Sequence, residues 1–422
     1  MTKYANHEHC PIFIAHRALH TYTSGELVRG VVRVDPKTRP HRIVLTFTGR
    51  LHVVIVRSNG QSSQTFKAKP ELFSRELILF SSPTPGASYD IVRVHGVTGD
   101  DRVELPFEFE FPECVEGDGG GLYRPEDGFE SQPGHVLPPS FGMFDGLYHG
   151  GESSQRVDYF LEAKLYTSST GSPSAQVRSW LSYRPPAPAL PAIPTALPQP
   201  TYYGLRGTYA RTYRLHPHYD PNEKLLAKIK HSWTKHNAST PFARFRVSAT
   251  CPAVLTTGCP IPISLSLLHM DRSKDIPDPP PIYLRRVRVR LTSTLDVRIA
   301  RYSVFSTRQA LRDSHRNKGT LLDQEYKTGN EMLLYDGLEL ATVRFPEEIA
   351  PGFSSYAMHL EHQLEVRIWG ECAKEKFEVV GAFGRVVVVA DVERPRREML
   401  VAEERPPEFD EDGAPPPYQG PG

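Results

Sequence analysis

The sequence has almost no net charge and few cysteines. Its 50 lysines and arginines are matched by 49 aspartates and glutamates, so no overall field would attract nucleic acid or an anionic membrane. The five cysteines lie far apart, include no CxxC pair and are odd in number, which indicates neither a disulfide framework nor a zinc site. We therefore expect reduced structural thiols, no metal, no cofactor and no nucleic-acid partner.

Long apolar runs are also missing. The N-terminus starts Met1-Thr2-Lys3-Tyr4 and lacks the apolar stretch of a secretory signal. Nothing in the chain is apolar for long enough to span a bilayer. The expected location is therefore the cytoplasm.

Signatures of catalysis are sparse. The two HxH pairs, His7 with His9 and His216 with His218, have no companion carboxylates or cysteines at ligand spacing. The glycines of residues 117–121 are followed by neither GK[ST] nor a helical pattern, so they predict a loop between strands rather than a phosphate cradle. We expect no catalytic residue and no enzyme activity. A hydrolase or transferase within a β-sandwich stays open as an alternative, because active sites assemble from residues distant in sequence.

Proline, glycine and alternating patterns are what the sequence has in abundance. Its 39 prolines and 31 glycines are too many for a mainly helical protein. In residues 103–111, apolar side chains alternate with glutamates, which is typical of a strand with one buried face, and Pro106 indicates a sheet edge. Further strands are predicted at residues 27–34, 42–48, 52–56 and 157–165. This spacing predicts an antiparallel sandwich over residues 1–184.

The composition changes abruptly after Arg184. Residues 185–240 begin with closely spaced prolines, which favour polyproline II and cannot build a core, so we expect an interdomain linker. Within it, residues 220–236 are interpreted as a short helix with an apolar side. Its lysines are candidate ubiquitin acceptors or contacts to a membrane surface, although an ordinary surface helix accounts for them equally well: Lys224, Lys228, Lys230 and Lys235.

Alternation then resumes and predicts a second sandwich over residues 241–394. Its strands are expected at residues 243–250, 262–268, 283–299, 361–369 and 385–392. Residues 395–422 are charged and rich in proline, with too little apolar surface to offset the entropy of ordering, so a disordered tail is predicted. The predicted fold class is all-β, with two tandem antiparallel immunoglobulin-like sandwiches.

Several sequence blocks resemble one family. The N-terminal blocks are SGELVRGVV at residues 24–32, RIVLTFTG at 42–49, LPFEFEFP at 105–112, LPPSF at 137–141 and VDYFLEAKL at 157–165. In this succession they resemble the N-terminal domain of the α-arrestins, and the insertions are similar to those of fungal members. A looser match follows in FPEEIAPGF at 345–353 and LEVRI at 364–368, which resemble the C-terminal arrestin domain. The resemblance implies an arrestin fold.

The resemblance also implies a function. Members of this family are adaptors that bind a membrane transporter or receptor as cargo and recruit a WW-domain HECT-type ubiquitin ligase through PPxY motifs. The cargo is then ubiquitinated and internalised, which implies recruitment to the plasma membrane or endosomes. The alternative within the fold is a signalling scaffold, for example in pH or receptor signalling, that does not promote cargo turnover.

A PPxY motif lies in the predicted tail and consists of Pro415-Pro416-Pro417-Tyr418. Prolines preset polyproline II, so little entropy is lost when they lie across an aromatic groove, and the tyrosine fills the adjoining pocket. We therefore predict that Pro415, Pro416 and Tyr418 bind the WW domain. Two degenerate versions, at residues 199–202 and 406–409, would add only avidity.

A second PPxY match begins the strand predicted at residues 283–299 and consists of Pro280-Pro281-Ile282-Tyr283. The favoured interpretation is structural, with Tyr283 taken into the strand and the prolines in the loop before it. The same strand carries Arg286, Arg288 and Arg290 on one face. They are candidates for contact with an acidic cargo segment, a phosphate or a phosphoinositide, weighed against an ordinary solvated sheet face.

Overall fold

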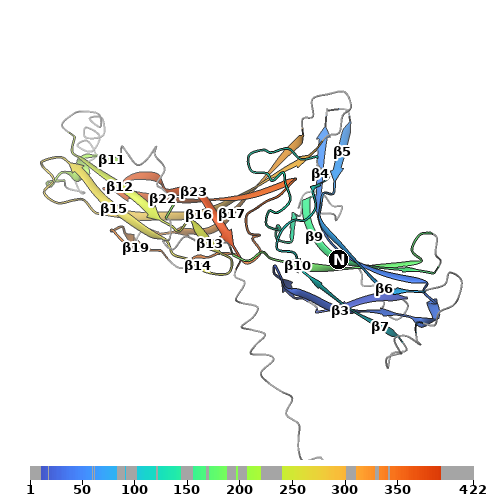
Figure 1. The fold of residues 1–422 in the computed structure, drawn as a ribbon. Coiled ribbons are helices and arrows are strands. Elements are labelled where there is room, and N and C mark those ends of the chain that lie inside the picture. Colours follow the sequence, from blue (N-terminus) through green and yellow to red (C-terminus); the bar gives the residue numbers. More distant parts are fainter. Residues whose placement is uncertain are drawn as a thin grey trace, which may run out of the picture.

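The computed structural model is all-β and comprises two β-sandwiches in tandem (Figure 1). It describes residues 11–17, 19–58, 60, 62–82, 91, 102–119, 122–143, 155–167, 171–187, 196–197, 207–219, 240–300, 310–327, 332–340 and 343–390. The predicted helix at residues 220–236, its lysines Lys224, Lys228, Lys230 and Lys235, and the tail motif with Pro415, Pro416 and Tyr418 lie outside the described residues. Within the described part of the chain, no helix has the length and apolar character needed to cross a membrane.

The N-terminal sandwich is built from two sheets. A three-stranded sheet has the order β1-β3-β7, and a larger sheet has the order β2-β10-β9-β4-β5, with β6 paired to β4 and β8 to β9. The strands are β1 (Ile12–His16), β2 (Thr21–Tyr22), β3 (Leu27–Val34), β4 (Arg42–Ser58), β5 (Ser63–Ala68), β6 (Glu71–Ser81), β7 (Val103–Glu110), β8 (Phe141–Met143), β9 (Gln155–Tyr166) and β10 (Ala175–Tyr183), with a 3-10 turn η2 (Pro36–Thr38).

Strand β7 has the face and the position that its sequence indicates. Leu105 and Phe107 are buried while Glu108 is exposed, so alternation does separate core from solvent. Its only sheet partner among the described strands is β3, and the edge position predicted from Pro106 is therefore confirmed. An edge strand tolerates Pro106 because proline has no backbone N–H to donate, and an edge strand forms a ladder on one side only.

Strand β4 corrects the sequence-based prediction of two short strands. Residues 42–58 form one continuous strand that pairs with β9 and β6, whereas the sequence predicts separate strands at residues 42–48 and 52–56. A Cβ atom at Gly49 would lie 2.5 Å from the Phe73 ring and 2.8 Å from the Tyr159 ring. The glycine therefore provides space for two aromatic rings rather than a turn.

The C-terminal sandwich has a four-stranded sheet, β11-β12-β15-β19, and a seven-stranded sheet with the path β13-β23-β22-β16-β17, in which β18 also pairs with β16 and β21 with β22. Strands β14 and β20 form a separate two-stranded sheet. Its strands are β11 (Thr208–Arg211), β12 (Phe242–Thr250), β13 (Val254–Thr256), β14 (Pro260–Ile261), β15 (Ser264–Arg272), β16 (Ile282–Ile299), β17 (Leu311–Glu325), β18 (Met332–Leu333), β19 (Leu338–Glu339), β20 (Val343–Arg344), β21 (Phe353–Ser354), β22 (Met358–Cys372) and β23 (Glu375–Val389), with a 3-10 turn η4 (Tyr213–Leu215).

Part of the predicted linker belongs to this second sandwich. Strand β11 pairs with β12, and the Leu197 amide donates to the Cys251 carbonyl over 2.8 Å. Leu197, Ala210 and Leu215 are all buried in the C-terminal core. These isolated apolar residues lie among prolines and polar residues, so no periodic pattern marks them in the sequence.

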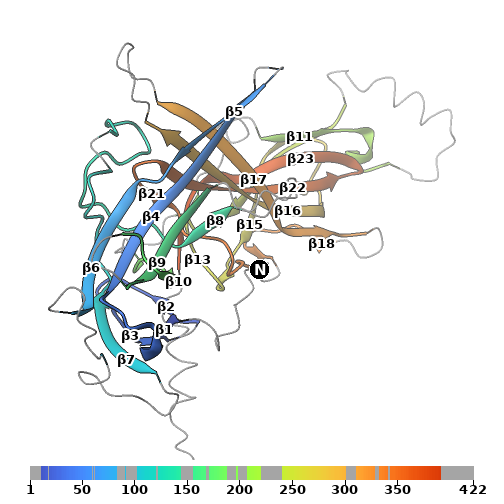
Figure 2. The ribbon, with the colours of Figure 1, turned by 90° about the vertical axis from the view of Figure 1, so that its right-hand side faces the viewer.

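The two sandwiches share a core where they meet. Strand β16 is so long that its C-terminal end extends into the N-terminal sandwich. Leu295 and Val297 at this end pack in the N-terminal core together with Tyr356 and Met358. Figures 1 and 2 show the β16–β17 pair reaching the long β4–β5 hairpin of the other sandwich. The junction is therefore a packed apolar contact rather than a linker alone.

Candidate functional site

The internal PPxY match is built into the C-terminal sheet. Tyr283 is the second residue of β16, and its backbone is paired with Leu333 of β18 and Glu371 of β22. Ile282 is fully buried. A WW domain needs the tyrosine and its prolines in one free polyproline II segment, and a residue held between two strands does not provide this.

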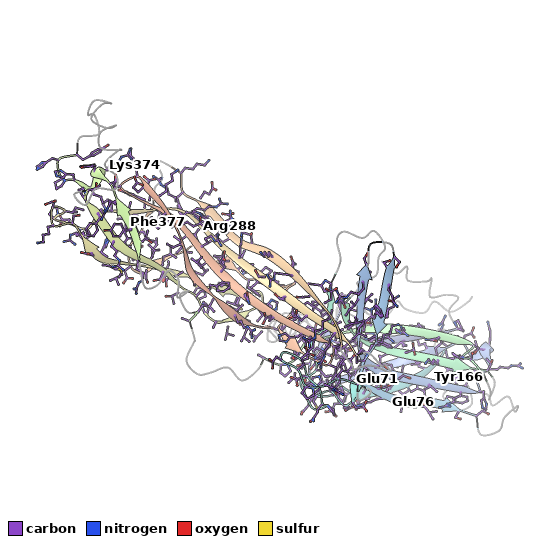
Figure 3. The ribbon with its side chains drawn as sticks, turned by 90° about the horizontal axis from the view of Figure 1, so that it is seen from above. Glu71, Glu76, Tyr166, Arg288, Lys374 and Phe377 are labelled. Carbon is purple, nitrogen blue, oxygen red and sulfur yellow. The ribbon has the colours of Figure 1, made fainter. Side chains whose placement is uncertain are left out.

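The prolines of this motif line a surface groove. Pro280, Pro281 and Tyr283 border a cavity of about 740 Å³ together with Arg214 and Lys374. Figure 3 places Lys374 at the far end of the C-terminal sandwich, away from the junction. Arg285 and Glu371, which also border the groove, pair with each other over 3.0 Å. The groove is therefore lined by partly neutralised charges.

The three arginines of β16 face outward from the same sheet. Alternation buries Val287 and Val289 and leaves the arginines on the opposite face. Arg286 donates to both carboxylate oxygens of Asp323 on β17 over 2.6 Å, and Arg288 donates to the same carboxylate over 2.9 Å. Figure 3 shows Arg288 along the middle of the C-terminal sandwich.

These contacts neutralise much of the arginine charge. The hydrogen bond from Arg286 is the largest influence that lowers the pKa of Asp323, to about 2, so this carboxylate stays ionised. Both guanidinium groups also lie 5.3 Å from the centre of the Trp369 ring, a favourable cation–π arrangement. Only Arg290 forms no ion pair with another described residue.

Of the two HxH pairs, His216 and His218 lie within the described residues. The His218 amide donates to Nδ1 of His216 over 3.2 Å, which occupies one of the two nitrogen atoms that could bind a metal. No group of three or more potential ligands gathers anywhere in the described ranges.

Sequence reasoning missed a buried arginine at the junction. Arg298, near the end of β16, is 1% exposed, and its guanidinium donates to the carbonyl oxygens of Tyr356, Arg124 and Glu130 over 2.6–2.9 Å. It also pairs with Glu126 over 3.1 Å. The sequence does contain a signal for it, because Arg298 is a charged residue between the apolar Val297 and Ile299 at the end of a predicted strand. In the structure all three residues are buried, so both faces of the strand are covered there.

No family model and no curated protein matches this sequence. The resemblance to the α-arrestins therefore rests on the sequence blocks themselves. Three of those blocks lie in core strands of the N-terminal sandwich. Residues 24–32 cover the turn before β3 and most of that strand, and residues 105–112 cover most of β7 and the two residues after it. Residues 157–165 lie within β9. All three contribute to one core.

Proposed function

We propose that the chain is an α-arrestin-like adaptor that links a membrane transporter or receptor to a WW-domain HECT-type ubiquitin ligase. The supporting observation is the tandem sandwich architecture, followed in sequence by Pro415-Pro416-Pro417-Tyr418 beyond the end of β23. This is the order of parts that the resemblance implies. No cofactor and no catalytic residue are part of the proposal.

The mechanism we propose is proximity. Cargo binds the sandwiches, the ligase binds Pro415, Pro416 and Tyr418, and tethering raises the effective concentration of the ligase near cargo lysines. Ubiquitin would also be attached to the adaptor itself, and the candidate acceptors are Lys224, Lys228, Lys230 and Lys235. The protein would act in the cytoplasm and at the plasma membrane or endosomes, associating peripherally with the membrane.

Binding of isolated WW domains to the full chain, measured by calorimetry, tests the ligase contact. We expect micromolar binding that Tyr418→Ala abolishes, because the ring fills the pocket beside the proline groove. Tyr283→Phe is the matched control, since it removes the second motif's hydroxyl and leaves β16 intact. Binding that survives Tyr418→Ala but not Tyr283→Phe would contradict this assignment.

Cargo turnover separates the adaptor from a signalling scaffold. Surface biotinylation in cells would compare the wild-type protein with Tyr418→Ala. An adaptor requires that specific membrane proteins persist at the surface when the ligase cannot dock. Unchanged turnover of every surface protein, with an altered signalling output, would favour the scaffold.

A further inference from the structure

A cleft at the junction of the two sandwiches gathers arginines from both of them. It has a volume of about 620 Å³ and lies beside the end of β4, residues 122–126, the end of β16 and the start of β17. Figure 2 shows the β4–β5 hairpin crossing beside β17. Its charged lining consists of Arg57, Arg124, Arg298, Arg312 and Glu126. We call this the junction cleft.

The positive charge in the junction cleft exceeds the negative charge. Glu126 is the one carboxylate in the lining, and it is shared between Arg298, at 3.1 Å, and Arg312. Four guanidinium groups therefore face a single carboxylate. The imbalance is local, because the whole chain carries a net charge of only +1.

Two of the arginines have no carboxylate partner in the cleft. Arg57 donates to the backbone carbonyl of Arg312, which offsets no charge. The carbonyl of Arg124 accepts from Arg298, while the side chain of Arg124 forms no ion pair with any described residue. Both side chains are exposed, so their remaining donors are available to a ligand.

The buried arginine strengthens the positive potential. Burial lowers the pKa of Arg298; Glu126 opposes this shift, and the nearby charge of Arg312 adds to it. Like charges held together in a partly enclosed site favour an anion between them. Guanidinium groups also match the oxygen spacing of phosphate with paired donors.

We propose that the junction cleft binds a compact anion with two phosphate groups. One phosphate would contact Arg57 and Arg124 of the N-terminal sandwich, and the other would contact the exposed guanidinium of Arg312 from the C-terminal sandwich. The volume of the cleft is in the range of small-molecule sites. Because the ligand bridges both sandwiches, its binding stabilises their junction by mass action.

Calorimetry and thermal unfolding of the full chain with inorganic pyrophosphate test the proposal. We expect saturable binding and a melting temperature that rises with pyrophosphate concentration. Arg124→Gln and Arg57→Gln should each weaken binding on the order of tenfold, since each removes a charge-assisted contact. Arg124→Gln is the sharper variant because its side chain holds no other described group in place.

Arg344→Gln is the matched control. Arg344 is an exposed arginine on β20, outside the lining of the cleft, and its substitution changes net charge equally. It should leave pyrophosphate affinity unchanged. An absence of saturable binding, or equal weakening in all three variants, would overturn the proposal, because either result means that general charge rather than the cleft is responsible.

The same chemistry can be presented by a lipid headgroup. Sedimentation with vesicles containing phosphatidylinositol bisphosphate, compared with vesicles lacking it, distinguishes that source from a free phosphate compound. Lipid-dependent binding that Arg124→Gln weakens would assign the headgroup as a ligand of the cleft. Pyrophosphate binding without vesicle binding would assign a soluble ligand. Vesicle binding that Arg124→Gln and Arg57→Gln leave intact, without pyrophosphate binding, would contradict a phosphate site here.

Discussion

At the scale of single residues, a buried histidine forms specific hydrogen bonds inside the fold. His362 on β22 is 2% exposed. Its Nε2 donates to the Ala350 carbonyl over 3.0 Å, and its Nδ1 accepts from the Ser293 hydroxyl over 2.9 Å. A neutral ring with its proton on Nε2 satisfies both hydrogen bonds, so the Ala350 carbonyl sets the tautomer of this histidine.

The neutral ring of His362 makes stability depend on pH. Burial lowers the pKa of His362 from 6.5 to about 4. The unfolded chain therefore binds a proton below pH 6.5 that the folded protein does not, and stability falls as the pH is lowered from 6.5 towards 4. We expect a loss of about 3 kcal/mol in the free energy of unfolding across this window.

Urea unfolding at a series of pH values measures this loss. His362→Gln keeps a donor and an acceptor but cannot titrate, so its stability should change less between pH 6.5 and pH 4 than that of the wild type. The difference between the two curves isolates His362 from the other titrating groups. Parallel curves for the two proteins would show that this ring does not control acid stability.

At the scale of the strand, glycines set how closely neighbouring elements approach. Gly30 of β3 lies between β1 and β7, where an added Cβ would be 2.3 Å from the Ala15 carbonyl oxygen and 2.6 Å from the Phe107 ring. Gly319 of β17 has nothing within 4 Å of the same atom. Two glycines within strands therefore have opposite requirements for space.

Gly30→Ala should destabilise the protein by about 2 kcal/mol, because the ladder on one side and the Phe107 ring on the other must move. Gly319→Ala is the control and should be neutral or slightly stabilising, since glycine weakens a strand interior when nothing needs its space. Chemical denaturation of both variants checks the pair. Equal destabilisation of the two variants would mean that the close packing around Gly30 is not the reason for its effect.

The strands that are clearest in the sequence are those with one buried face. Strands β7 and β22 alternate cleanly between buried and more exposed residues, so period-two patterning identifies them. The sequence does not predict strand β17, because all fifteen of its residues are exposed or partly exposed and most are polar. It is held by the β16 ladder and by the contacts of Asp323.

The same limit applies to the candidate site. The placement of Tyr283 in a strand and the outward direction of Arg286 follow from local alternation. The partners of these arginines do not, because Asp323 and Trp369 are brought to them by two different neighbouring strands. The junction cleft was missed for the same reason, since its arginines are far apart in sequence and meet only through the packing of both sandwiches.

For the whole molecule, the shared core means that the two sandwiches are not independent. Tyr356 is fully buried at the junction, donates to the Gly117 carbonyl over 2.5 Å and stacks on Tyr123 with ring centres 5.8 Å apart. The His135 ring meets it edge to face. One side chain from the C-terminal half thus contacts three places in the N-terminal half, which couples the unfolding of one sandwich to the other.

Calorimetric unfolding should accordingly show one cooperative transition for both sandwiches. Tyr356→Ala removes a buried aromatic ring and should cost about 3 to 5 kcal/mol and divide the transition in two, because it takes away the contacts that couple the halves. Tyr209→Ala is the control: that ring stacks on Phe242, is 49% exposed and lies within the C-terminal sandwich. It should lower stability less and keep a single transition. Two separate transitions in the wild-type protein would mean that the shared core does not couple the unfolding of the two sandwiches. Any coupling would then require a ligand bound in the junction cleft.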